Sequence, residues 1–106
     1  MASRMSLGPG RSVSGLPKVW PQLEAKDFCH GRFNAPGGRH CLLGWFYESC
    51  DDVTDDAIDD FYAAFCRITN GRRHVAGWSD THSFAKCAEL WNAIGEELGY
   101  TEWVRA

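Results

Sequence analysis

The sequence predicts a mainly α-helical protein: a compact bundle of three or four short helices, with or without one small β-hairpin, preceded by a flexible N-terminal arm. Two long segments place apolar residues three and four positions apart, as helices do. Gly, Pro and Asn gather between the apolar segments and predict turns. With 106 residues, 44% of them hydrophobic, the chain has enough apolar material for one core.

The first segment, 1–16, is predicted to be a flexible basic arm, because its Gly, Ser and Arg content cannot bury enough surface to offset ordering. The remainder, 17–106, is predicted to be a single globular helical domain. Pro17 to Phe28 is predicted to be a short helix, with Pro21 at its first turn and Trp20 towards the core. The glycines between Cys29 and Arg39 predict turns or a small hairpin.

Cys41 to about Ser49 is apolar on nearly every side, which is typical of a helix buried at the centre of a domain. The next helix has a clear start and end. Thr54 is a good N-cap, and Asn70-Gly71 is typical of a left-handed C-terminal cap. Its apolar stripe is formed by Ala57, Ile58, Phe61, Ala64, Phe65 and Ile68.

Arg72 to Gly77 is predicted to be a loop or a short extended segment. The last helix is then expected to begin near Asp80 or Thr81, either of which can accept hydrogen bonds from free N–H groups at a helix start. Trp78 is expected to precede this helix and pack on it. The helix's apolar stripe is formed by Phe84, Cys87, Ala88, Trp91, Ile94 and Leu98, and Gly99 ends it.

Two motifs stand out: Cys41-Leu42-Leu43-Gly44, and Trp78-Ser79-Asp80-Thr81 before the final helix. Over about residues 38–100 the chain resembles an uncharacterised family of small bacterial and phage proteins. That family has a Cys-Leu-Leu-Gly-Ala element and a Trp-Asn-Asp element followed by Thr. Here Trp45 replaces the usual Ala and Ser79 replaces Asn. The resemblance implies a shared fold and a phage or mobile-element origin, without a known reaction.

Charge is unevenly distributed in this chain of net charge −3. Arg4 and Arg11 make the arm basic, whereas six aspartates, which we call the acidic surface, crowd one short stretch: Asp51, Asp52, Asp55, Asp56, Asp59 and Asp60. A direct nucleic-acid binder would show a basic face, so we expect none of that activity. Closely spaced carboxylates instead suit a solvated helix face or a protein partner. The chain contains no apolar run of about 20 residues, so no membrane span is expected.

The five cysteines are expected to be reduced thiols that pack as small apolar groups, with disulfides and metal ligation as alternatives. A zinc site would use Cys29, His30, His40 and Cys41, which flank the predicted turn. Otherwise no cofactor is expected.

A cysteine enzyme would use Cys41 as nucleophile, since a helix N-terminus, Arg39 and His40 would lower the thiol pKa. His74 or His82 would then be the base and Asp80 would orient it.

These patterns favour a non-enzymatic accessory protein of phage origin that acts through protein–protein contacts, with itself or with a host protein. The first interpretation is a virion structural or assembly component, in which the basic arm of one copy lies on the acidic surface of another. The alternatives are an inhibitor of a host factor that uses the acidic surface, and the cysteine enzyme. The expected location is the host cytoplasm, with incorporation into a virion under the first interpretation.

Overall fold

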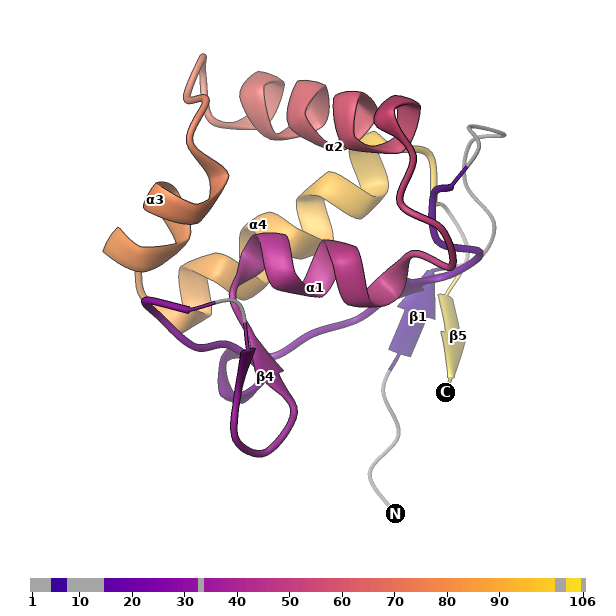
Figure 1. The fold of residues 1–106 in the computed structure, drawn as a ribbon. Coiled ribbons are helices and arrows are strands. Elements are labelled where there is room, and N and C mark those ends of the chain that lie inside the picture. Colours follow the sequence, from indigo (N-terminus) through magenta and orange to yellow (C-terminus); the bar gives the residue numbers. More distant parts are fainter. Residues whose placement is uncertain (1–4, 8–14, 33, 101–102, 106) are drawn as a thin grey trace.

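The computed structural model describes residues 5–7, 15–32, 34–100 and 103–105. Four helices dominate it: α1 (Leu42–Ser49), α2 (Asp55–Ile68), α3 (Val75–Thr81) and α4 (Phe84–Glu97). Figure 1 shows α2 along the top and α1 below it, with α4 running obliquely behind them and α3 at the left. The mainly helical fold class with a small hairpin is therefore confirmed.

Short strands complete the fold. The predicted hairpin is β3 (Asn34–Ala35) and β4 (Arg39–His40), which pair antiparallel. A second antiparallel sheet has β1 (Met5–Leu7) between β2 (Trp20–Pro21) and β5 (Trp103–Arg105), so both ends of the chain meet in one sheet (Figure 1). Within the predicted arm, β1 is thus a strand, while Arg4 and Arg11 lie outside the described residues.

The predicted helix over 17–28 is wrong. The segment is extended at β2 and then forms one 3₁₀ turn, η1 (Ala25–Asp27). Trp20 is fully buried, and its indole N–H donates to the carbonyl of Trp91 at 2.9 Å, while the Trp91 indole N–H donates to the carbonyl of Pro21. This reciprocal contact requires an extended backbone beside α4, and it outweighs the local helical pattern.

Trp20 is also the centre of the aromatic core. Its ring stacks on Trp91 with centroids 4.2 Å apart, and Phe46 of α1 stacks on Phe61 of α2 at the same separation. Gly95 permits the approach of α4, because a Cβ there would lie 2.3 Å from Trp20 Cδ1. Dense packing of this kind tolerates neither voids nor added atoms.

Helix α1 is confirmed as a helix packed on the core, but burial on every side is wrong. Leu42, Leu43 and Phe46 are buried, whereas Tyr47 is 39% exposed and Glu48 faces solvent. The reason is that only one face of α1 packs on the aromatic core, where Phe46 contacts Phe61 of α2 and Trp20.

Both ends of α2 agree with prediction. The Thr54 hydroxyl accepts a hydrogen bond from the Ala57 N–H at 3.1 Å. At the other end Asn70 has a φ of +58°, and the Gly71 N–H donates to the Cys66 carbonyl at 2.9 Å. This is the left-handed cap that the Asn-Gly pair predicts.

The region before the last helix differs from prediction. Residues expected as a loop begin helix α3, because Val75 and Ser79, one turn apart, are both buried. Consequently Asp80 and Thr81 end α3 and do not cap α4. The cap of α4 is Ser83, whose hydroxyl accepts from the Lys86 N–H at 3.2 Å. Gly99, with φ +95°, ends α4 as expected.

Candidate functional site

The two sequence motifs meet where α1 packs against α3. Ser79 is fully buried on α3, and its hydroxyl accepts a hydrogen bond from the Leu42 N–H at 3.2 Å. The Cys41 thiol is the N-cap of α1 and accepts from the Gly44 N–H at 3.4 Å. Two free N–H groups of the first turn of α1 are therefore satisfied, one by each motif.

Asp80 joins this α1–α3 junction to the loop after η1. Its carboxylate accepts a hydrogen bond from the Gly31 N–H at 2.8 Å. Beside it, the His30 ring nitrogen Nε2 lies 2.8 Å from the carbonyl of His82, and the His30 ring packs on Phe84. These contacts fix the loop against the turn between α3 and α4.

A cavity of about 200 Å³ lies between these parts. Its lining is formed by Gly31, Arg32, Cys41, Ala76 and Asp80. Gly31, Arg32 and Asp80 are exposed, so the cavity reaches the surface, while Cys41 is its buried lining residue. A basic residue, an acidic residue and a cysteine therefore line one cavity.

The thiols at the junction are less acidic than the sequence predicts. Burial raises the pKa of Cys41, and the hydrogen bonds from Gly44 and Leu43 only partly oppose this. Burial likewise raises the pKa values of Cys29 and Cys87. The expected lowering of the Cys41 pKa is thus wrong in sign, because loss of hydration outweighs the helix N-terminus.

The predicted Cys-His-Asp arrangement is not assembled. His74 is the exposed N-cap residue of α3, and His82 stacks on Trp78 at 3.8 Å with its Nδ1 at the Trp78 carbonyl. Among the described residues no hydrogen bond joins either histidine to Cys41 or Asp80. Asp80 instead holds the Gly31 loop.

The four candidate zinc ligands do not form one site, because both histidines turn to other partners. The Cys29 thiol donates to the Arg32 carbonyl, His30 turns to His82, and the His40 ring nitrogen pairs with the Asn34 side chain. Neighbouring residues in extended chain point to opposite sides, so a Cys-His pair does not converge. In the ranges that the structure describes, no three His, Cys, Asp or Glu side chains form a group suited to a metal ion.

The acidic surface lies at the start of α2. All of its aspartates are exposed except Asp60, which is half-buried. Two apolar side chains are exposed in the same part of the chain, Tyr47 (39%) and Val53 (37%). Lys18 lies 3.9 Å from Asp51, but both side chains are well exposed, so this ion pair adds little stability.

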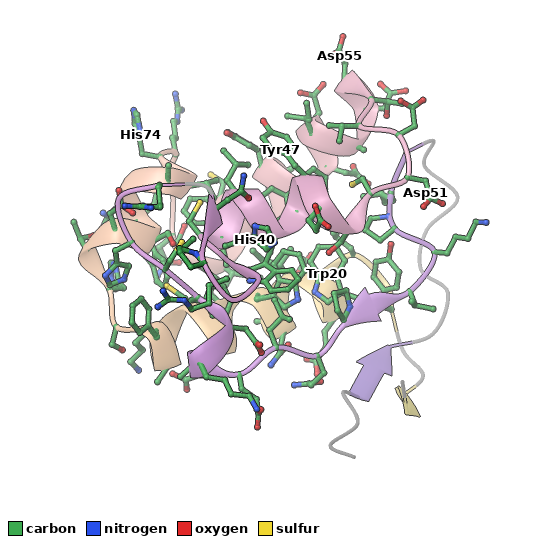
Figure 2. The ribbon with its side chains drawn as sticks, turned by 60° about the horizontal axis from the view of Figure 1, so that its bottom comes forward. Trp20, His40, Tyr47, Asp51, Asp55 and His74 are labelled. Atoms are coloured by element: carbon green, nitrogen blue, oxygen red, sulfur yellow. The ribbon has the colours of Figure 1, made fainter. Side chains whose placement is uncertain are left out.

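The opposite end of α2 carries a second charged surface that the sequence analysis missed. Arg72, Arg73 and His74, which we call the basic turn, are all exposed. Figure 2 shows His74 at one side of the molecule and Asp51 and Asp55 at the other. The available signal was three consecutive basic or imidazole residues directly after the glycine that ends a helix.

Comparisons with protein-family models, curated proteins and solved structures found no match to this chain. The resemblance to the small bacterial and phage family therefore stays a prediction. None of the helices in the described ranges combines the length and the apolar character needed to cross a membrane.

Proposed function

We propose that this protein is a non-enzymatic assembly component that binds further copies of itself head to tail, the acidic surface of one copy on the basic turn of the next. The observation that carries the proposal is the opposite charge at the two ends of α2. Complementary charge on one chain favours a contact between unlike surfaces, and repetition of such a contact builds rings or filaments.

The acidic surface and the basic turn are too far apart to contact each other within one molecule, which favours a contact between two copies. Helix α2 has 14 residues, which corresponds to a length of about 21 Å. The Debye length at physiological salt is about 8 Å, so the two surfaces barely attract each other within one molecule. Each remains available to a neighbour.

Exposed apolar side chains would add hydrophobic burial to the electrostatic attraction at this contact. Val53 follows Asp52 in the chain and Tyr47 is exposed on the preceding helix α1, and an interface needs such apolar groups at its centre with charges at its rim. Arg4 and Arg11 of the arm would add positive charge against the same acidic surface, as the sequence predicts.

The phage origin implied by the resemblance makes a virion structural or assembly protein the form of this function that we propose. In that role the chain is made in the host cytoplasm and then incorporated into a particle. Its partners are copies of itself.

Sedimentation velocity of the full chain at low and high salt tests the proposal. We expect oligomers at low salt that dissociate as salt rises, and that disappear in the variant Arg72→Glu/Arg73→Glu. A matched control is Lys26→Glu/Arg39→Glu, which changes net charge equally at exposed sites on η1 and β4. A monomer at every salt and protein concentration would contradict the proposal.

A second candidate is an inhibitor that binds a basic surface of a host protein. The observation in its favour is the set of exposed, closely spaced carboxylates with the exposed Val53 among them, a surface that suits a basic partner. This candidate would be favoured if the original chain stays monomeric and captures a host protein, and if the variant Asp52→Lys/Asp59→Lys captures none.

A further inference from the structure

Two cysteines lie opposite each other at the edge of the α1–α3 junction. Phe28 and His40 form a parallel bridge, and the Cys29 N–H donates to the His40 carbonyl at 3.1 Å. Cys29 and Cys41 are the next residue of each segment after this bridged pair, and in a parallel register the side chains of such residues leave the same face. Paired strands lie about 4.8 Å apart, within the roughly 4.4–6.8 Å range of Cα separations that disulfides span.

The electrostatics of the thiols agree with this backbone register. Burial raises the pKa of Cys41, and the neighbouring Cys29 thiol raises it further. Both thiols are held only by weak sulfur hydrogen bonds of 3.4 Å, Cys29 to the Arg32 carbonyl and Cys41 from the Gly44 N–H. Sulfur is a weak donor and a weak acceptor, so neither bond holds its thiol strongly.

The cavity at the junction gives a small molecule access to this pair. Cys41 and Arg32 both line this cavity, Cys41 as a buried residue and Arg32 as an exposed one. Arg32 and Arg39 oppose the rise in the pKa of Cys29 and Asp80 adds to it, so two cationic side chains and one carboxylate act on this thiol. An anionic molecule is therefore attracted to the opening.

We propose that Cys29 and Cys41 form a thiol–disulfide exchange site that is oxidised by small anionic disulfides of the glutathione class. The Cys41 thiolate attacks one sulfur of the small disulfide, whose S–S bond breaks, and the departing thiolate takes up the proton that Cys41 lost. The Cys29 thiolate then attacks the Cys41 sulfur and releases the second small thiol, which takes the proton of Cys29. Two electrons pass from the protein dithiol to the small disulfide, which ends as two thiols.

Cys87 is the competing partner for Cys41, because it also lies near enough to be affected by the Cys41 thiol. Its sulfur, however, is held by Ser79, at 3.6 Å from the carbonyl and 3.7 Å from the hydroxyl. No backbone pairing sets Cys87 opposite Cys41, whereas the 28–40 bridge does so for Cys29.

The test treats the folded full chain with oxidised glutathione at mildly alkaline pH and maps its disulfides by mass spectrometry of unreduced peptides. We expect a Cys29–Cys41 bond and the loss of two hydrogen atoms from the protein. Closing this short loop should also raise the melting temperature, by on the order of 10 °C. A Cys41–Cys87 bond, or no bond between Cys29 and Cys41, would overturn the proposal.

Single variants separate the two steps. Cys29→Ser should stop at a stable glutathione adduct on Cys41, because the second thiol is missing, whereas Cys66→Ser, a half-buried control on α2, should react as the original chain does. Serine keeps an acceptor at the N-cap of α1, so Cys41→Ser should fold. Its Cys29 thiol should react with oxidised glutathione much more slowly than Cys41 reacts in the original chain. Equal modification of Cys29 and Cys41 in these variants would contradict the assigned order.

Arg32→Gln tests the attraction of the anion. We expect this variant to react several-fold more slowly with oxidised glutathione but equally fast with the neutral 2-hydroxyethyl disulfide. Equal rates of the variant and the original chain with both reagents would refute the role of Arg32.

Discussion

The core around Trp20 and the two ends of α2 use polar groups in opposite ways. In the core, both indole N–H groups and the Ser79 hydroxyl have partners within the chain. At the ends of α2, Arg72 and Arg73 have no ion pair among the described residues, and the carboxylates of the acidic surface mostly face solvent. The core therefore stabilises the fold, and the ends remain for partners. Substitutions should separate these two roles.

The largest stability loss is expected from Trp20→Ala. It removes a fully buried ring, its stacking on Trp91 and the hydrogen bond to the Trp91 carbonyl. We expect the free energy of unfolding to fall by about 3–5 kcal/mol, measured by urea unfolding. The control Val19→Ala, at a 45% exposed neighbour, should change it by less than about 0.5 kcal/mol. Similar losses in both variants would contradict the description of this core.

Gly95→Ala and Gly77→Ala form a matched pair with opposite expected signs. In a helix Ala is favoured over Gly by about 1 kcal/mol. At Gly95 the added Cβ would meet the Trp20 ring at 2.3 Å, so we expect a net loss of about 1–3 kcal/mol. At Gly77 the nearest atom outside the helix backbone is 3.5 Å away, so Ala should stabilise or leave stability unchanged. Thermal unfolding measures both, and a more stable Gly95→Ala would show that Trp20 does not lie against α4.

Ser79→Ala tests the α1–α3 junction. It leaves the buried Leu42 N–H without its acceptor, which should lower the free energy of unfolding by about 1–3 kcal/mol. The reference is Ser83→Ala, an exposed N-cap, for which about 1 kcal/mol is expected. Neither change should alter self-association in sedimentation. A loss of oligomers in Ser79→Ala without loss of stability would place the junction in the interface.

The raised pKa of the Cys50 thiol predicts how the stability of the fold depends on pH. Burial raises its pKa to about 11 from 9.0, so the folded chain holds this proton more tightly than the unfolded chain. The resulting stability is present below pH 9 and is lost as pH rises from 9 to about 11, by on the order of 2 kcal/mol. Urea unfolding across this range should show the fall, and Cys50→Ala should reduce its slope. A slope unchanged by the substitution would contradict the burial of this thiol.

The smallest stability effect is expected at the ends of α2. Lys18→Ala removes an exposed ion pair with Asp51, and Arg72→Glu/Arg73→Glu alters exposed side chains, so each should change the free energy of unfolding by less than about 0.5 kcal/mol. Self-association is expected to respond only to the arginine pair. A large stability loss in that variant would mean that the basic turn supports the fold.

The sequence was sufficient where local signals and tertiary packing agree. Thr54, Asn70 and Gly99 mark real helix ends, and the glycines between β3 and β4 mark a real hairpin. Prediction from the sequence failed at Trp20 and at α3, because long-range contacts determine the local structure there. The hydrogen bond from the Trp20 indole to α4 spans 71 positions, and the Ser79 contact that fixes α3 spans 37.

The candidate site was predictable only in its parts. The Cys41 and Ser79 motifs were evident, but their meeting was not, because neither spacing nor periodicity reveals which helices pack together. The thiol pKa values depend on burial, which a helix N-terminus alone does not indicate. The basic turn was overlooked because its importance depends on its distance from the acidic surface along α2.

The most direct test of head-to-tail assembly mixes two variants, each damaged at one end. Asp52→Lys/Asp59→Lys weakens the acidic surface, and Arg72→Glu/Arg73→Glu reverses the basic turn, so each alone should sediment as a monomer at low salt. In the mixture, the intact basic turn of the first meets the intact acidic surface of the second, and we predict one-to-one dimers that grow no further. A mixture that remains monomeric while the original chain forms oligomers would contradict the account.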